Sequence, residues 1–194
     1  MPAETTIEST RSPAAPDPDA SGLPAELDAS TTPRLLVGGV GYRLLRDLSF
    51  GPLLADRLAK DKWPDGVEIE DLSYGPIGVM HNLDSRPPYD RIVLVGAVKR
   101  GRPPGDVLRY SWRRQLPDEE EIQARVAEAV TGVISLDNLL IIATYFGKLP
   151  HDVVVIEVEP ADEDWGEEFS PEVEAAVPRV IEEIRLSIAG WLPS

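Results

Sequence analysis

The feature that most constrains the fold is the alternation of strand-like and helix-like segments that begins after Pro33. One of these segments, RIVLVGAV at 91–98, is nearly continuous in apolar residues, as expected for a central strand that is covered on both faces. The alternation predicts an α/β fold, in which an open twisted, mostly parallel sheet carries helices on both faces. The five predicted strands span residues 35–38, 67–71, 91–98, 107–111 and 153–158.

The spacing of apolar residues predicts helices at 50–60, 117–129, 136–146 and 171–189. Ser170 followed by Pro171 is typical of a helix start, and it supports the beginning of the last helix. Gly75, Pro76 and Gly78 predict a turn before any short helix in the segment 74–83.

The first 33 residues differ in composition from the rest of the chain. Six prolines are scattered among Ala, Ser, Thr, Asp and Glu, with few large apolar residues. Such a segment cannot offset its ordering entropy by burying apolar surface, so we expect residues 1–33 to be a disordered tail. A tether with a short docking element around Leu23 to Leu27 is the alternative. Residues 34–194 are long enough to form a single domain with its own core.

Composition excludes several classes of function. The net charge of −15 argues against binding to nucleic acid, whose affinity comes from Lys and Arg, and against anionic membrane surfaces. The absence of cysteine excludes disulfides, thiolate zinc sites and cysteine nucleophiles. No apolar stretch approaches the length of a membrane span, and no signal-peptide core is present near the start. We therefore expect a cytoplasmic protein.

A glycine-rich turn follows the first predicted strand, in the segment LLVGGVGYRLLRDLSFGP at 35–52. It does not complete a dinucleotide-binding fingerprint, because the third glycine is missing, and no Lys followed by Ser or Thr closes it as a phosphate loop. Leu48 is the unexpected residue, because it places an apolar side chain where the strand-to-helix turn would carry chemistry.

Four segments together make the chain resemble the hydrogenase maturation peptidases, the endopeptidases that process nickel-iron hydrogenase large subunits. In order, they are GVGYRLLRDLSFGP from Gly39, VEIEDLSYGPIG from Val67, RIVLVGAVKRGRPPGDV from Arg91 and VEPADEDWGEEFSPEVEAAVP from Val158. The resemblance covers about residues 34 to 190. It implies a twisted sheet with a metal site at the strand ends, and a nickel-loaded large-subunit precursor as the substrate.

The resemblance also implies three metal ligands, an acid, an Asp and a His, and this chain has none of them at the matching positions. The acid matches Leu48, the Asp matches Gly96, and an ungapped match places the His at Gly132. The asparagine that usually follows the glycine turn is Tyr42. Nickel favours imidazole or carboxylate donors, which leucine and glycine lack. We therefore expect no metal cofactor and no catalytic residue at these positions.

Two interpretations of the remaining polar residues are open. Asp47, Asp71 and His81 have suitable ligand chemistry for a rebuilt site, whereas their simpler roles are turns, caps and surface. A second group of residues is basic: Lys99, Arg100 and Arg102. These side chains either hold an acidic or C-terminal segment of a partner, or they are ordinary solvated charges of a loop.

The acids between 157 and 168 are interpreted as a solvated loop, and Trp165 within them is a possible interface anchor.

Two functions follow from these observations. The first is a non-catalytic assembly factor or chaperone that binds a nickel-iron hydrogenase large subunit or another hydrogenase assembly protein. The alternative is an active metal-dependent endopeptidase, which would use nickel and remove the C-terminal peptide of the large-subunit precursor. Whether the protein is an enzyme is therefore open at the level of sequence, and the missing ligands favour the first function.

Overall fold

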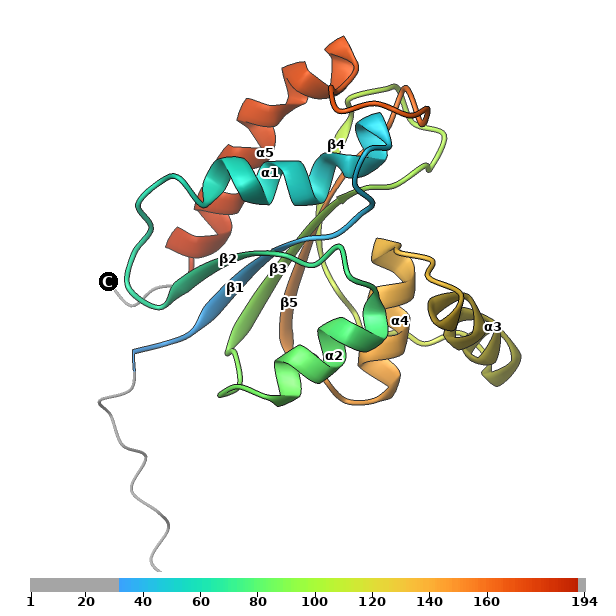
Figure 1. Cartoon of the computed structure of the whole chain (residues 1–194). Helices are drawn as coiled ribbons and strands as arrows, with labels where there is room; N and C mark the ends of the chain where they lie inside the picture. The colour runs from blue at the N-terminus through green and yellow to red at the C-terminus, as the bar shows by residue number, and fades with distance from the viewer. Residues whose placement is uncertain (1–31, 192–194) are drawn as a thin grey trace, which may run out of the picture. The chain divides into compact units, whose positions relative to one another are not determined.

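The sheet predicted from the sequence is present in the computed structural model, which describes residues 32–191 (Figure 1). Its strands are β1 (Leu35–Gly39), β2 (Val67–Asp71), β3 (Arg91–Ala97), β4 (Val107–Ser111) and β5 (Asp152–Val158). They are arranged in the order β2-β1-β3-β5-β4, and all neighbours are parallel except β4, which pairs antiparallel with β5. The predicted open, mostly parallel sheet is confirmed. The tail prediction for 1–33 falls almost wholly outside the described residues.

Helices cover both faces of the sheet, as predicted (Figure 1). On one face, α1 (Phe50–Leu58) and α5 (Pro171–Ala189) pack against the apolar side chains of the strands. On the other face, α2 (Pro76–Asp84) and α4 (Leu136–Tyr145) do the same, and α3 (Glu119–Val130) lies against α4. A short 3-10 helix, η1 (Arg46–Ser49), leads directly into α1. The two buried layers explain why β3 and β5 are largely apolar.

Side-chain caps set the starts of three helices. Asp118 accepts a hydrogen bond from the Glu121 N–H, so α3 begins at Glu119 and not at 117 as the apolar spacing predicts. Ser135 caps α4 and Ser170 caps α5 in the same way. The predicted turn before α2 is confirmed, because Gly75 adopts a φ of 84° immediately before the helix.

The start of α1 lies unusually close to the backbone of the sheet. A Cβ atom on Gly51 would lie only 2.3 Å from the Val40 carbonyl oxygen and 2.6 Å from the Val95 carbonyl oxygen. Only glycine permits this approach. The contact holds the turn between β1 and α1 against the carboxyl ends of β1 and β3.

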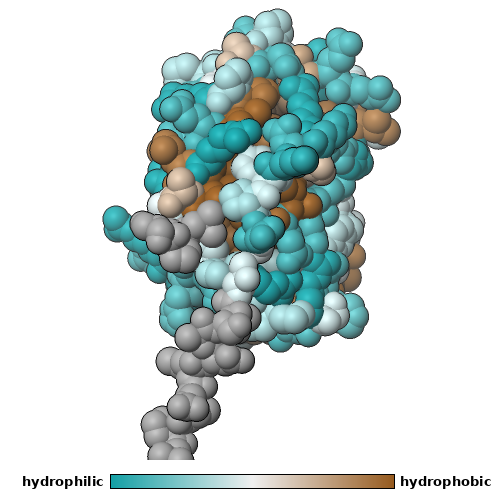
Figure 2. Space-filling view, turned by 90° about the vertical axis from the view of Figure 1, so that its left-hand side faces the viewer, coloured by the Kyte–Doolittle hydropathy of each residue, from teal (hydrophilic) through white to brown (hydrophobic). Residues whose placement is uncertain are grey.

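The face of the molecule seen in Figure 2 is largely hydrophilic, with hydrophobic residues showing mainly in a central band. No helix between residues 32 and 191 is long and apolar enough to cross a membrane.

Candidate functional site

A cavity of about 210 Å³ lies at the carboxyl ends of β1 and β3. The chain leaves β1 toward β2 on one side and returns to β3 on the other, so this is the switch point of the sheet, where open α/β folds usually bind ligands. The turn after β1, the end of β3 and the start of α4 contribute its walls, which consist of Val40, Gly41, Tyr42, Leu48, Ala97, Val98, Lys99, Ile134, Ser135, Leu136 and Asp137.

The wall formed by the turn after β1 is apolar at the position where the resemblance implies an acid. Leu48 lines the cavity, as its position in the turn predicted. Tyr42 crosses from the same turn to the loop before α4, where its hydroxyl accepts a hydrogen bond of 3.0 Å from the Ile134 N–H. Tyr42 thus fixes the two walls to each other.

The charged residues of the cavity are paired with other residues of the chain. The Lys99 ammonium lies 2.5 Å from a Glu163 carboxylate oxygen, although most of the Lys99 side chain is exposed. Asp137, in the first turn of α4, pairs with Arg100 at 2.7 Å. The lining therefore combines an apolar wall with a rim of paired charges.

Gly96 occupies a position that is closed to a side chain, and it is the position that matches the expected aspartate. A Cβ atom there would lie 2.8 Å from the Val40 carbonyl oxygen and 3.6 Å from Leu136 Cδ2. Contacts under 3.0 Å require the neighbour to move, and here that neighbour is backbone of the adjoining turn. An aspartate side chain at this position would therefore need a backbone shift.

Gly132, the position that the ungapped match gives to the histidine, has no side chain and is not part of the cavity lining. Gly132 lies in the turn after α3 with a φ of 91°, outside the cavity lining, and a Cβ atom there would meet no other atom within 4 Å. Residues 134–137 line the cavity instead, and none of them is a histidine.

The residues present do not fit a nickel ion. Leu48 and Gly96 provide no side-chain donor atom, and the one carboxylate in the cavity lining, that of Asp137, is engaged by Arg100. Across residues 32–191, no three His, Asp or Glu side chains come together in a way that could hold a metal ion. Divalent nickel needs several imidazole or carboxylate donors at once.

Asp47 is fully buried and serves to join two loops. Its Oδ2 atom accepts hydrogen bonds from the Ala161 and Asp162 N–H groups at 2.9 Å and from the Ser170 hydroxyl at 2.8 Å. Its Oδ1 atom accepts from the Ser170 N–H at 2.8 Å. All these partners belong to the loop before α5, so the carboxylate is committed to holding that loop against the turn after β1.

Asp71 and His81 lie in other surroundings. Asp71 ends β2, accepts the Ser73 N–H at 2.8 Å as a turn former does, and pairs with Arg43. Burial raises the pKa of Asp71, but its bonds to Ser73 and the Arg43 guanidinium outweigh burial and hold the pKa below its usual value. His81 is exposed on α2. The structure does not bring Asp47, Asp71 and His81 into one cluster.

Arg100 and Arg102 pair with acids of β5 and the residues just after it. Glu157, which is 1% exposed, accepts from Arg100 at 2.7 Å, from Arg102 at 3.3 Å and from the Tyr110 hydroxyl at 2.8 Å. Glu159 accepts from the Arg100 N–H and from Arg102 Nε at 3.2 Å. Of the three predicted basic binding residues, Lys99 alone keeps a mostly exposed side chain.

Glu157 and Glu159 correct the interpretation of the 157–168 acids as a solvated loop, because both are buried. Glu157 belongs to β5, whose other residues are mostly apolar, and an acid in such a strand requires a buried partner. That signal is present in the run VVVIEVE. The sequence identifies Ser170 only as a helix cap. Its hydrogen bonds to the Asp47 carboxylate leave no local signal in the sequence.

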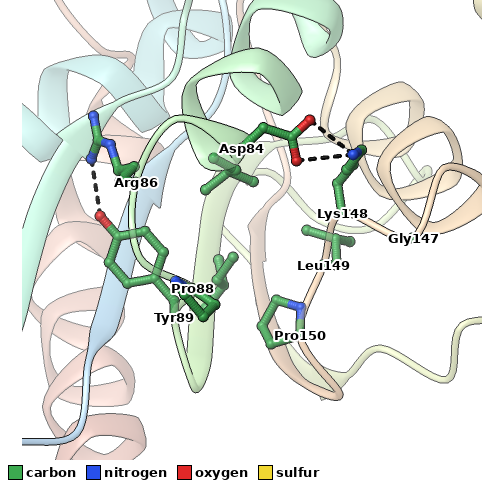
Figure 3. A pocket seen from close by; sticks show the side chains of 10 residues that line it. Asp84, Arg86, Pro88, Tyr89, Gly147, Lys148, Leu149 and Pro150 are labelled. Atoms are coloured by element: carbon green, nitrogen blue, oxygen red, sulfur yellow. Dashed lines mark hydrogen bonds and ion pairs between the residues drawn. The ribbon is translucent and has the colours of Figure 1, made fainter. Parts of the chain in front are cut away.

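A second cavity, of about 310 Å³, lies at the opposite end of the sheet, where the loops before β3 and β5 meet (Figure 3). Asp84 pairs with Lys148 across one side, and Arg86 donates to the Tyr89 hydroxyl on the other. Figure 3 shows that these polar groups bond to one another. The first cavity is the better candidate site, because it lies at the carboxyl ends of the strands, where open α/β folds usually bind ligands.

Comparison with known proteins gives the family of the chain. A family model described as hydrogenase maturation protease matches residues 52–186. No curated protein matches the chain. Among solved structures, a hydrogenase 2 maturation peptidase from a Thaumarchaeota archaeon has 30% identity, a TM-score of 0.57, and coverage of 81% of this chain and 98% of its own.

Two further structures have the same fold. The hydrogenase maturating endopeptidase HybD from E. coli has 25% identity and a TM-score of 0.59, with 81% of this chain and 94% of its own covered. The maturation protease HycI from Thermococcus kodakarensis has 23% identity and a TM-score of 0.60, with 82% and 95% covered, and supports the fold alone. On the family match and the archaeal structure, the chain belongs to the hydrogenase maturation protease family.

Proposed function

We propose that this protein is a non-catalytic member of its family, an assembly factor that binds a nickel-iron hydrogenase large subunit without cutting it. Family membership supports the hydrogenase partner, and the chemistry of the switch-point cavity supports the absence of cleavage. Within this proposal the protein works in the cytoplasm, where a large subunit is still unassembled.

The observation that carries the proposal is the closure of the site around Gly96. A Cβ atom at Gly96 would lie 2.8 Å from the Val40 carbonyl oxygen, so an aspartate at this position needs a backbone shift. The Leu136 side chain lies at ordinary contact distance from that Cβ position, and Leu48 lines the switch-point cavity. An apolar cavity suits an apolar side chain of a partner, because burial of such a side chain contributes about 1.5–3 kcal/mol.

The test is to mix the purified protein with the nickel-loaded large-subunit precursor from the same organism. We expect a complex on size-exclusion chromatography and a precursor whose intact mass is unchanged. Nickel-dependent loss of a C-terminal peptide would refute the absence of catalysis, and failure to form any complex would refute the proposed partner. A family member that retains the acid, Asp and His ligands provides the control for a cleavable precursor.

A nickel titration separates the proposal from the alternative of a rebuilt catalytic site. By calorimetry we expect no stoichiometric binding of nickel to the wild-type protein. Binding that disappears in Asp47→Ala but persists in Asp56→Ala would favour the active endopeptidase, since Asp56 lies on the exposed side of α1 and pairs with Arg43.

A further inference from the structure

Two loops at the carboxyl edge of the sheet are joined into one rigid unit, which we call the paired loops: residues 42–49 and residues 160–170. Leu45 and Gly166 form a parallel β-bridge, in which the Arg46 N–H donates to the Gly166 carbonyl and the Gly166 N–H donates to the Leu44 carbonyl, both at 3.0 Å. The buried Asp47 carboxylate adds four hydrogen bonds from 160–170. An Arg46–Asp162 ion pair of 2.9 Å completes the connection.

The backbone of the first loop is strained. Leu44 has a φ of 67° and Arg46 a φ of 37°, and neither residue is a glycine. Such conformations cost of order 1–3 kcal/mol each and persist only where the surroundings enforce them. The bridge and the Asp47 bonds provide that enforcement. The contacts between the paired loops therefore hold Leu44 in this conformation.

The paired loops display two apolar side chains to solvent. Trp165 is 78% exposed, more than any other large hydrophobic residue between 32 and 191, and Leu44 is 48% exposed. Leu44 directly precedes Leu45 and Trp165 directly precedes Gly166, so the two residues are adjacent positions on the two bridged loops. An exposed tryptophan on a rigid support loses little conformational entropy on binding, and tryptophan is among the commonest hot-spot residues of protein interfaces.

Unpaired acids surround Trp165. Asp164, Glu167 and Glu168 are exposed, and none of them forms an ion pair with any residue in the described range 32–191. The cations that reach this loop, Arg46 and Lys99, are already paired with Asp162 and Glu163. A surface that receives Trp165 must therefore offer positive charge around an apolar pocket.

We infer that Trp165 and Leu44 form a docking anchor for the hydrogenase large subunit, inserting into an apolar pocket that is bordered by Lys and Arg. This inference rests on the proposed function and specifies its interface. It differs from the switch-point cavity, because the anchor projects from the protein whereas the cavity receives a group from the partner. The turn at 42–49 belongs to both, so one partner can contact them together.

The test measures the dissociation constant of the complex with the large-subunit precursor by biolayer interferometry for wild-type protein and matched variants. Trp165→Ala should weaken binding at least tenfold, equivalent to ~1.4 kcal/mol. Val130→Ala is the control, because Val130 is 71% exposed on α3, away from the paired loops. Urea unfolding of each variant confirms that the fold is retained, since neither side chain belongs to the core.

Charge gives a second, independent measurement. Glu167→Lys should weaken binding and flatten its dependence on salt, whereas Glu182→Lys, an equal charge change on the exposed side of α5, should alter neither. If wild-type protein binds the precursor and Trp165→Ala binds equally well, the anchor is refuted and the proposed function stands. If wild-type protein forms no complex, both are refuted. If Trp165→Ala instead abolishes self-association of the protein, the surface belongs to a second copy and the inference is wrong.

Discussion

Replacement of Asp47 by alanine should destabilise the protein strongly, although the residue belongs to no metal site. The change removes the acceptor for four hydrogen bonds. Ala161 and Asp162 are at least partly open to solvent, so their N–H groups can bond to water. The Ser170 N–H and hydroxyl are buried and cannot, and each unsatisfied group costs about 1–3 kcal/mol. Relief from burying a charge offsets part of the loss, so we expect about 3 kcal/mol.

The assay is urea unfolding followed by tryptophan fluorescence, together with thermal unfolding. For a domain of this size, ~3 kcal/mol corresponds to a fall in Tm of about 6–12 °C. Asp47→Asn keeps the shape, but its amide nitrogen must face at least one N–H donor, so it should lose about 2 kcal/mol. The control is Asp56→Ala, which removes an exposed pair with Arg43 and should cost less than ~1 kcal/mol.

Two results would refute this reasoning about Asp47. The first is a loss below about 1 kcal/mol in Asp47→Ala, which would mean that the carboxylate does not hold the loops together. The second is a stability difference between wild type and Asp47→Ala that appears only with nickel and vanishes with EDTA, since the hydrogen bonds need no metal.

Three further predictions concern other parts of the site and fold. Burial raises the pKa of Glu159, but hydrogen bonds from the Arg100 and Gly101 N–H groups and from Arg102 outweigh burial and lower the pKa. The carboxylate therefore stabilises the fold fully above the unfolded pKa of about 4.3, and this stabilisation is lost as the pH falls through the lower folded pKa. The free energy of unfolding should consequently depend less on acid pH in Glu159→Gln than in the wild type. Gly51→Ala should cost about 3 kcal/mol in urea unfolding, because its Cβ would overlap two carbonyl oxygens. The control is Gly190→Ala, where φ is −72° and the new Cβ would come no nearer than 3.3 Å to the Leu186 carbonyl oxygen; an equal cost for both changes would contradict the close approach. Leu48→Glu should restore no nickel binding in a calorimetric titration, because the one other carboxylate in the cavity lining, that of Asp137, is held by Arg100. Stoichiometric binding would contradict this reasoning.

The sequence predicted most of the fold because its signals are local. Apolar runs and helical spacing identified all five strands within one or two residues, and Ser170 marked the start of α5. The predicted start of α3 is two residues too early, because the apolar spacing does not show that Asp118 caps the helix. The family match also follows from local motifs in order along the chain.

The candidate site was only partly predictable. The sequence showed that Leu48 and Gly96 lack donor side chains, but not that the Val40 carbonyl lies too close to Gly96 for a side chain there. It also left Asp47 open as a ligand, whereas the structure commits it to Ser170 and its loop. Contacts between residues more than a hundred positions apart leave no periodic signal in a single sequence.

The sequence alone thus determined the fold class and the family, and it showed that Leu48 and Gly96 carry no donor side chain, because strand and helix periodicity and residue chemistry are properties of the chain itself. Only the tertiary structure decided what surrounds those two positions. It showed an apolar cavity closed at Gly96, buried partners for Glu157 and Glu159, and an exposed Trp165 on loops held by Asp47. The physical reason is that burial and the pairing of charges depend on contacts between segments that are far apart in the sequence, and a single sequence does not show which of those segments come into contact.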